Sequence, residues 1–392
     1  MTDSSKHIVE LNVEQAVGHR YSAASQAAEP ALCCPVQYDP KYLKLLPEEL
    51  IERDYGCGDP SRYVEHGSVV LDLGCGGGKI CYIASQIVGA EGRVLGVDMN
   101  DDMLALARKY QGEIAQRLGW DIVSLYKGRI PDLALDMERF EAYLRENPVS
   151  SSADWLRAQQ HADELRRSDP MIASESVDVV LSNCVLNLVR PEDRRQLFAE
   201  IFRVLRRGGR AVISDIVCDE PVPQHLKEDP ELWSGCISGA FLEDEFIEEF
   251  ARAGFYGMEI MSRQEEPWAT VEGIEFRSVT MRAFKGKEGP CLDHHQAVIY
   301  KGPWKQVVDD DGHTLRRGLR TAVCEKLFRL YTGPPYEDDI LPIAPYQEVN
   351  PALALTFDCQ RSAVRHPRET KGLDYDKNEL PSSECCSDDG CC

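Results

Sequence analysis

The chain has 392 residues, a net charge of −22 and 15 cysteines, and 43% of its residues are hydrophobic. This length exceeds what one hydrophobic core usually holds, so we expect one large domain with smaller units beside it. The negative charge argues against nucleic acid as a partner, because phosphate groups would be repelled.

The N-terminal segment, residues 1–67, has neither the basic start nor the continuous apolar run of a secretion signal. No later run is long enough to span a bilayer, so we expect a cytoplasmic protein without a membrane partner. In a reducing compartment, cysteines serve as ligands, nucleophiles or core residues more often than as structural bridges.

The pattern that begins at Ser68 is a strand, a glycine-rich turn, a helix and a second strand that ends at Asp98. Strand and helix alternate again after residue 176, where an amphipathic helix is expected to stop at Gly208 and Gly209. This alternation over residues 68–217 predicts an α/β fold of the Rossmann-like, doubly wound type with a mostly parallel sheet.

Between these two parts, residues 132–170 are charged and are predicted to form a helical insertion. Residues 218–285 follow the sheet as a further region.

The turn DLGCGGGK predicts a nucleoside-binding site. Gly74, Gly76 and Gly78 allow the backbone to approach a ligand closely, and Asp98 is placed to accept hydrogen bonds from ribose hydroxyls. Lys79 stands where a dinucleotide-binding motif has Gly or Ala. The turn therefore resembles the S-adenosylmethionine site of Rossmann-like methyltransferases.

The predicted strand in VDVVLSNCVLNL ends in polar residues, Ser182 and Asn183, followed by Cys184. Ligands of open parallel sheets bind at the carboxyl ends of the strands, so these residues are expected at the edge of the cofactor site. Cys57 in DYGCGDP and Cys236 in LWSGCISGA also have small neighbours. The three thiols can converge on a soft ion, or each can be a packing residue; both interpretations stay open.

Residues 286–372 are predicted to form a small separate unit, in which AVIYKGPWKQVVDDDGHTLRRGLRTAVC reads as a β-hairpin around an Asp-Asp-Gly turn. The segment 373–392 is expected to be a mobile tail. Its cysteines suit the scavenging of soft metals or belong to a dispensable end: Cys385, Cys386, Cys391 and Cys392. Packing roles are expected for Cys75, Cys81, Cys218, Cys291, Cys324 and Cys359, and surface positions for His294 and His295.

The motifs DYGCG, VLDLGCGGGK, GVDM, SNCVLNLV, FRVLRRGG, SDIV and LWSGCISGA occur in this order and resemble the arsenite S-adenosylmethionine methyltransferase family. The resemblance covers most of residues 30–285, and SNCVLNL and GCISGA are its specific parts. It implies a class I methyltransferase fold and methyl transfer from S-adenosylmethionine to thiolate-bound trivalent arsenic, as detoxification. It also implies that Cys184 and Cys236 bind arsenic, that Cys57 is a third thiol that binds arsenic or takes part in disulfide exchange, and that Cys33 or Cys34 is a further redox cysteine.

Asp72, Met99 and Asn183 lie within these motifs and are expected to contact the cofactor together with the glycine turn and Asp98. Arsenite or its thiol complexes are the implied substrate. Glutathione or thioredoxin is the implied reductant, because methyl transfer oxidises arsenic. We favour a monomer.

Two alternatives remain: a methyltransferase of another soft or thiol acceptor, and a non-catalytic metalloid-binding protein. Two features depart from the family. The insertion 132–170 could cover the substrate entrance, and Arg207 stands where proline is common.

Overall fold

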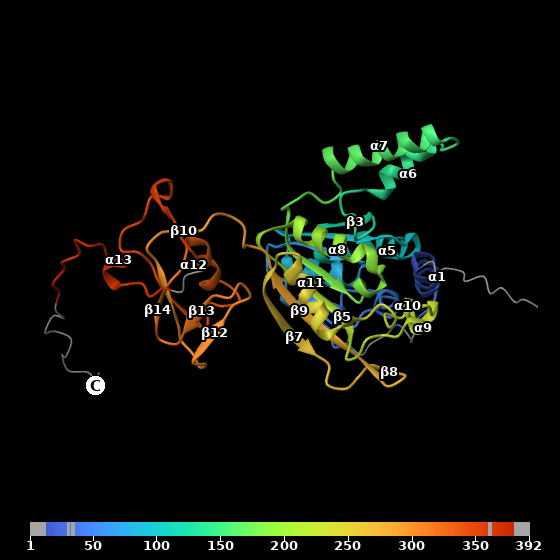
Figure 1. The fold of residues 1–392 in the computed structure, drawn as a ribbon. Helices are drawn as coiled ribbons and strands as arrows, with labels where there is room; N and C mark the ends of the chain where they lie inside the picture. The colour runs from blue at the N-terminus through green and yellow to red at the C-terminus, as the bar shows by residue number, and fades with distance from the viewer. Residues whose placement is uncertain (1–12, 30–31, 33–35, 360–362, 380–392) are drawn as a thin grey trace, which may run out of the picture. The chain divides into compact units, whose positions relative to one another are not determined.

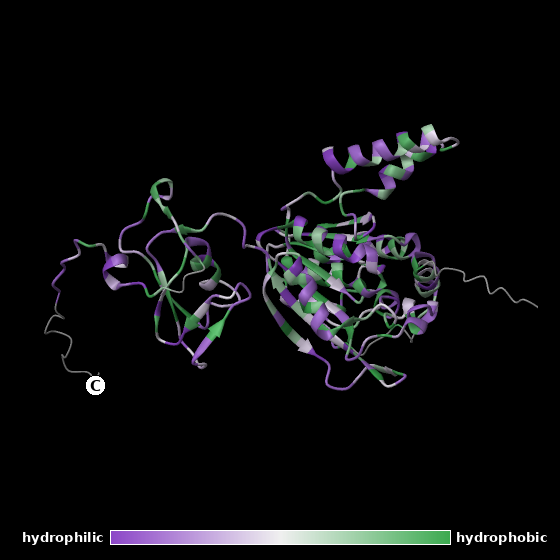
Figure 2. Cartoon of the chain, viewed as in Figure 1, coloured by the Kyte–Doolittle hydropathy of each residue, from purple (hydrophilic) through white to green (hydrophobic). Residues whose placement is uncertain are grey.

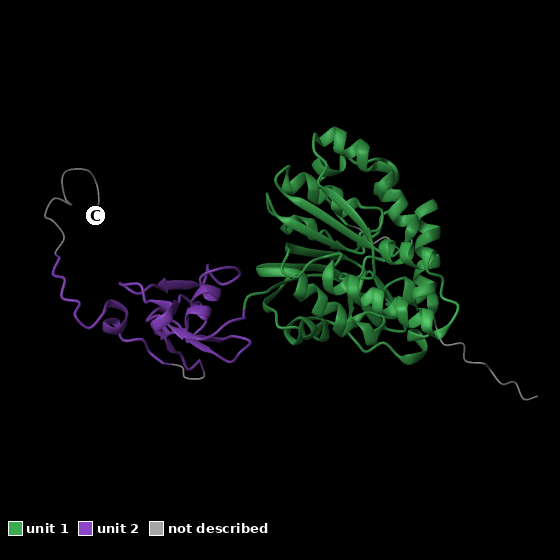
Figure 3. Cartoon of the chain, turned by 90° about the horizontal axis from the view of Figure 1, so that it is seen from above, with its two compact units in different colours: residues 1–286 green, residues 287–392 purple. Residues whose placement is uncertain are grey.

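The structure, a computed structural model, describes residues 13–29, 32, 36–359 and 363–379. The chain divides into two compact units, Met1–Gly286 and Lys287–Cys392 (Figure 3). None of the helices within the described ranges is both long and apolar enough to cross a membrane.

The first unit is built on a nine-stranded sheet (Figure 1). Its strands are β1 Val69–Leu73, β2 Arg93–Asp98, β3 Val123–Lys127, β4 Val177–Asn183, β5 Leu205–Cys218, β6 Phe241–Leu242, β7 Tyr256–Arg263, β8 Ala269–Val271 and β9 Ile274–Phe284. The order is β3-β2-β1-β4-β5-β9-β7, with β6 beside β5 and β8 beside β9. Strands β1 to β5 pair in parallel, whereas β9 runs antiparallel to β5 and β7 runs antiparallel to β9.

Helices connect and cover these strands. They are α1 Val13–Gln26, α2 Pro40–Leu43, α3 Glu48–Glu52, η2 Pro60–Tyr63, α4 Lys79–Val88, α5 Asp101–Leu118, α6 Met137–Glu146, α7 Ser152–Ser168, η3 Leu186–Leu188, α8 Pro191–Val204, α9 Gln224–Lys227, α10 Pro230–Ser234 and α11 Glu243–Arg252. Local sequence fixes some of their ends: the Asn100 side chain caps α5 by accepting hydrogen bonds from the backbone of Asp102 and Met103, and Gly119 ends that helix in a left-handed conformation.

Both faces of the sheet are covered, as the two apolar cores on either side of β4 demonstrate. Val179 and Leu181 pack in a core shared with α4 and α5, whereas Val177 and Val180 pack in the core shared with α8 and α11. A strand with helices on both faces must be apolar on both, and all seven residues of β4 are buried. Figure 2 shows the same pattern, with largely hydrophobic central strands and helices of mixed hydropathy around them. The predicted doubly wound, mostly parallel α/β fold is confirmed.

The predicted end of the helix before β5 is wrong. Helix α8 ends at Val204, and Leu205 already pairs with Val177 as the first residue of β5. Gly208, at a φ of +82°, donates its N–H to the carbonyl of Lys285 at 2.7 Å. The two glycines therefore shape an irregular start of a strand, where their freedom allows a bulge, and do not cap the helix.

The insertion 132–170 is helical, as predicted. Helices α6 and α7 form a pair beside β3 (Figure 1). A small apolar cluster of Leu135, Ala162 and Leu165 holds the pair, and Arg166 forms an ion pair with Asp132 at 2.9 Å.

The second unit contains short strands and helices: β10 Leu292–Asp293, β11 Ala297–Tyr300, β12 Gln306–Val308, β13 Thr314–Arg316, β14 Arg320–Ala322, α12 Glu325–Tyr331, β15 Ile340–Ile343, η4 Pro351–Leu353, β16 Leu355–Thr356 and α13 Pro367–Lys371. The order β14-β11-β15 forms one sheet, and β10 pairs with β16. Strands β12 and β13 form the predicted hairpin, closed by a 3.0 Å hydrogen bond from Gly312 to Asp309.

Candidate active site

A cavity opens in the first unit where the carboxyl ends of β1, β2 and β4 meet. The predicted residues that line it are Gly74, Gly76, Asp98, Met99, Asn183, Cys184 and Cys236. The parallel sheet explains this gathering, because its strands end at one edge and their connecting turns form the rim.

The glycine turn after β1 has the close approach that its sequence predicts. Gly74, Gly76 and Gly78 all have left-handed φ angles, between 52° and 87°. A Cβ atom at Gly74 would lie 2.5 Å from a methyl group of Val185. Glycine is therefore required there both by backbone conformation and by space.

Asp98 lies at the end of β2 and faces this turn. Its carboxylate accepts the N–H of Gly76 at 2.9 Å and the N–H of Asn100 at 2.8 Å, one on each oxygen. Burial raises the pKa of Asp98 above its usual value. Each carboxylate oxygen keeps a lone pair for a further donor, so the group can still accept hydroxyl hydrogen bonds. Met99, 42% exposed, adds an apolar surface to the same cavity.

Asp54 is a cavity residue that sequence reasoning missed. Its carboxylate accepts the backbone N–H of Lys79 at 2.5 Å, and the Lys79 ammonium donates to the backbone carbonyl of Asp54. Burial raises the pKa of Asp54 to about 6, although the charge of Lys79 opposes the shift. The lysine that departs from the dinucleotide motif thus ties the glycine turn to the segment before Cys57.

Cys184 and Cys236 share an uncommon backbone conformation. Their φ angles are +66° and +63°, in the left-handed region that costs a residue with a side chain about 1–2 kcal/mol. Backbone hydrogen bonds hold both turns. The N–H of Cys184 donates to the carbonyl of Ser214 at 2.7 Å, and the N–H of Cys236 donates to the carbonyl of Trp233 at 3.0 Å. Such strain persists where the surroundings enforce it, typically at binding sites.

The glycines beside Cys57 allow its loop to pack directly on the ends of β4 and β5. A Cβ atom at Gly56 would lie 2.2 Å from the Asn183 amide, and one at Gly58 would lie 2.4 Å from the Ser214 hydroxyl oxygen. Asn183 accepts the N–H groups of Cys57 at 2.9 Å and Gly58 at 3.0 Å. Asn183 therefore fixes the loop that carries Cys57.

Cys184 lies between the other two thiols. Its Sγ, that of Cys57 and a carboxylate oxygen of Asp215 lie within 4.8 Å of one another, and the Cys236 thiol donates to the Cys184 carbonyl at 3.3 Å. Hydrogen bonds with Cys236 and Cys57, followed by burial, raise the pKa of Cys184 well above 9. Burial likewise raises the pKa of Cys57. Both thiols are thus protonated at neutral pH.

Asp215 is a second residue that sequence reasoning missed. It is fully buried in β5, and its carboxylate accepts the N–H groups of Leu186 and Ile216, each at 2.8 Å. Burial raises the pKa of Asp215 to about 6. The carboxylate holds the turn that directly follows Cys184.

Helix α1 also contributes to the cavity, through Glu14, Val17, Gly18 and Tyr21. Burial, followed by the nearby Cys236 and Cys184 thiols, raises the pKa of Tyr21 well above 10. The spacing of these four residues places them on one face of a helix, and this pattern in the sequence could have indicated a helix that faces the site. The segment was not predicted as a helix.

Other predicted residues lie elsewhere. Cys57, Asp72 and Gly78 are absent from the described cavity lining, and the buried Asp72 carboxylate accepts a hydrogen bond from the Cys81 thiol at 3.3 Å. No residue of 132–170 lines the cavity either, so the idea that this insertion covers the substrate entrance finds no support in the lining. Cys33 and Cys34 lie outside the described residues, as do the tail cysteines Cys385, Cys386, Cys391 and Cys392.

The remaining cysteines divide into two kinds. Cys75, Cys81 and Cys218 are buried, in agreement with packing roles. In the second unit Cys324 is buried, whereas Cys291 and Cys359 are half-buried, so packing roles for these two stay a prediction. His295 is exposed as predicted, and His294 is half-buried.

Comparisons with known proteins agree with this geometry. Residues 65–254 match a family model described as a methyltransferase domain, and residues 287–375 match one described as a domain of unknown function. The sequence is 32% identical to an arsenite methyltransferase of Aquipseudomonas alcaligenes, over 78% of this chain and 83% of the relative. The chain belongs to the arsenite methyltransferase family. It is also 28% identical to an arsenite methyltransferase of Mus musculus, over 75% of this chain and 72% of that protein.

Structural comparison agrees with this membership. The crystal structure of an arsenic(III) S-adenosylmethionine methyltransferase from Chlamydomonas reinhardtii matches with a TM-score of 0.53 and 25% identity, over 83% of this chain and all of that chain. As a member of the arsenite methyltransferase family, the protein is an S-adenosylmethionine-dependent enzyme that methylates trivalent arsenic. This activity favours arsenic over another acceptor, and catalysis over binding alone.

Proposed function

We propose that Cys57, Cys184 and Cys236 hold the trivalent arsenic, and that the glycine turn with Asp98 holds S-adenosylmethionine beside it. The observation that carries this proposal is the position of Cys184. Its thiol lies against those of Cys57 and Cys236, and the residue also lines the cavity that Asp98 and Gly76 border.

The residues around the glycine turn fit the cofactor. Gly74 and Gly76 leave room for a ligand against the backbone, the Asp98 carboxylate retains acceptor capacity for ribose hydroxyls, and Met99 offers an apolar surface. When bound, S-adenosylmethionine supplies a methyl group on a positively charged sulfur. The task of the protein is then to hold this group and the arsenic as fixed partners, which removes most of the entropic cost of their encounter.

The thiols bind arsenite by exchange and need not be ionised beforehand. Each new As–S bond replaces an As–O bond and releases one water molecule, so the proton of the thiol leaves with the oxygen. The raised pKa of Cys184 therefore fits a site that stays protonated until its substrate arrives. Arsenic held by three thiolates keeps a lone pair, which can accept the methyl group. Asp215 and Asn183 act as positioning residues for this thiol group.

Methyl transfer takes arsenic formally from the trivalent to the pentavalent state, so two electrons are needed to restore it. Two thiols can supply them by forming a disulfide, and Cys33 or Cys34 is our candidate for the further redox cysteine. A thiol reductant, glutathione or thioredoxin, would then reopen the disulfide. A cytoplasmic location suits this chemistry because thiols stay reduced there. We favour a monomer, since one chain provides all of the proposed thiols.

The test is Cys184→Ser in the full-length enzyme, assayed with labelled S-adenosylmethionine, arsenite and glutathione. Serine keeps the size of the side chain but replaces a soft ligand with a hard one. We expect methylation to be lost and arsenite affinity to fall by at least about tenfold, with cofactor affinity unchanged. Cys81→Ser is the control, because this buried thiol lies away from the cavity and should affect stability only.

Cys236→Ser should behave like Cys184→Ser, and the double variant should be little worse than either, since ligands that act as a unit are not additive. Arsenite methylation at the wild-type rate by Cys184→Ser would remove this cysteine from the site.

A further inference from the structure

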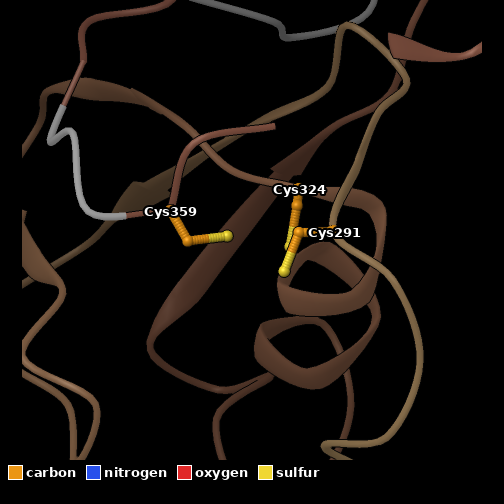
Figure 4. A group of neighbouring side chains, drawn as sticks. All are labelled: Cys291, Cys324 and Cys359. Atoms are coloured by element: carbon orange, nitrogen blue, oxygen red, sulfur yellow. The ribbon is translucent and has the colours of Figure 1, made fainter. Parts of the chain in front are cut away.

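The second unit contains its own group of three thiols (Figure 4). The sulfur atoms of Cys291, Cys324 and Cys359 lie within 4.8 Å of one another, and all three cysteines are free. Their side chains point toward one another from three segments that are far apart in the sequence. The group lies in the region that matches a domain of unknown function, so the site described above does not explain it.

Backbone contacts hold each of these cysteines in place. Cys291 directly precedes β10, and the pairing of β10 with β16 continues in a 2.9 Å hydrogen bond from the N–H of Phe357 to the Cys291 carbonyl. Cys359 follows on the same segment as β16. Cys324 is the N-cap of α12, where its sulfur accepts the N–H of Leu327 at 3.4 Å. The convergence is therefore fixed by the fold of this unit.

An ion can reach the group. Cys324 is fully buried, whereas Cys291 and Cys359 are half-buried and line a cavity of about 500 Å³. Lys326 lines the same cavity. One face of the thiol group is thus closed by the protein interior and the other is accessible.

The electrostatic surroundings of the two half-buried thiols differ. Burial acts to raise the pKa of Cys291, but hydrogen bonding with Cys359 and the charge of Lys326 outweigh it and lower that pKa below 9. Burial, together with hydrogen bonds from its neighbours, raises the pKa of Cys359.

We propose that Cys291, Cys324 and Cys359 form a second site for a soft, three-coordinate metalloid, and that trivalent arsenic is its ligand. Binding of arsenite there breaks three As–O bonds, forms three As–S bonds and releases three water molecules, with no change of oxidation state. Arsenic is chosen as the ligand because the family methylates arsenic, and this choice rests on the proposed function. The coordination number of three follows from the number of thiols in the group.

The ligand count separates arsenic from zinc. Structural zinc sites almost always have four ligands. Among the residues that the structure describes, no fourth Cys, His, Asp or Glu atom lies within 4.8 Å of all three sulfurs. His313 borders the cavity, but its Nδ1 is 2.8 Å from an Asp309 carboxylate oxygen in a separate group. Three thiolates without a fourth ligand suit arsenic, which keeps a lone pair on its open side.

The experiment counts bound arsenic on the full-length chain. Cys33, Cys34, Cys57, Cys184, Cys236 and the four tail cysteines are replaced by serine in the background, so that neither the proposed catalytic and redox thiols nor the tail contribute. The reduced protein is titrated with arsenite and followed by native mass spectrometry and by near-ultraviolet sulfur-to-arsenic absorbance. We expect one arsenic per chain with three sulfur bonds, and its affinity should fall by at least about tenfold on adding Cys291→Ser or Cys359→Ser.

Cys291 and Cys359 are chosen for substitution because Cys324→Ser would also disturb the start of α12. Cys218→Ser is the matched control, a cysteine outside both thiol groups whose Sγ lies 3.3 Å from the Phe241 carbonyl oxygen. Melting temperatures identify any variant that fails to fold. Equal arsenic binding with and without Cys291→Ser would overturn the proposal, and so would a background protein that binds no arsenic. Zinc that binds through these cysteines and is not displaced by arsenite would overturn it in favour of a zinc site.

Two single variants distinguish failure of this second arsenic site from failure of the proposed catalytic site. In otherwise wild-type protein, Cys184→Ser should abolish methylation and keep the second arsenic, whereas Cys291→Ser should lose that arsenic and keep methylation. Loss of both properties in either single variant, with an unchanged melting temperature, would show that the two thiol groups are not separate sites.

Discussion

The side-chain oxygen of Asn183 lies 2.9 Å from the backbone nitrogen of Cys57 and accepts its hydrogen. The same oxygen accepts the N–H of Gly58, while the amide nitrogen of Asn183 donates to the Gly58 carbonyl at 2.8 Å. The residue that precedes Cys184 thus sets the position of a second thiol, and the spacing between these two cysteines depends on one amide group.

Asn183→Ala should therefore weaken both the fold and the proposed arsenic site. It leaves two backbone N–H groups without their acceptor, which should lower the free energy of unfolding by about 1–3 kcal/mol. Arsenite affinity should fall as well, because the Cys57 loop loses its anchor. Denaturant unfolding and arsenite titration measure the two effects. Asn183→Asp keeps the acceptor oxygen and should retain more of both, so equal losses in the two variants would contradict this role.

Asp98→Ala should reduce the affinity for S-adenosylmethionine by about 1–3 kcal/mol, because ribose hydroxyls lose a charged acceptor. Arsenite binding should be unaffected. Isothermal titration calorimetry with each ligand checks both statements. Asp102→Ala, an exposed residue in the first turn of α5, is the control. Unchanged cofactor affinity in Asp98→Ala would remove Asp98 from the site.

Replacing α6 and α7 by a short loop should leave catalysis nearly unchanged. None of the described residues that line the cavity comes from this pair, although the sequence suggested that it covers the entrance. We expect kcat and KM for arsenite within about twofold of wild type. The cost should appear as lower stability, since Leu135 loses its packing partners. A large change in KM at an unchanged melting temperature would instead restore the idea of a lid.

The pKa of Asp215 predicts a specific pH dependence of stability. Its folded-state pKa of about 6 lies above the ordinary value of 3.8. Below pH 4 the carboxyl is protonated in both states and has no effect, whereas above pH 6 it is ionised in both and its burial costs about 3 kcal/mol. The contribution of Asp215 to stability should therefore decrease as the pH rises from 4 to 6.

Asp215→Asn removes this dependence, so the stability of the variant relative to wild type should rise across that interval. Denaturant unfolding at several pH values measures the difference. Asp54, which has a similar pKa, is present in both proteins and cancels. A difference that stays constant between pH 4 and pH 6 would contradict the assignment.

The residues of the site that could be predicted are those that belong to short, continuous sequence patterns. Gly74, Gly76 and Asp98 belong to a continuous strand–turn–helix–strand unit, and their spacing alone places them at one edge of a parallel sheet. Cys184 could be located because a buried strand breaks off just before it. Such features depend only on neighbours in the chain.

Residues whose role depends on distant partners could not be predicted. Asp54 and Asp215 acquire their raised pKa values from burial, which follows from tertiary packing. The grouping of Cys291 with Cys359 depends on strands of two residues, too short to leave a pattern in the sequence. The end of α8 was misjudged because Gly208 serves an irregular strand and not a helix cap.

The left-handed conformation of Cys184 and Cys236 has a consequence for how this protein can change. Glycine at either position would relieve about 1–2 kcal/mol of backbone strain, against about 0.5–1 kcal/mol for its greater freedom in the unfolded chain. Cys236 is buried in an apolar cluster and Cys184 packs against that cluster, so glycine would also remove favourable packing. Glycine at either position is therefore expected to remove a proposed arsenic ligand at a small net change in stability.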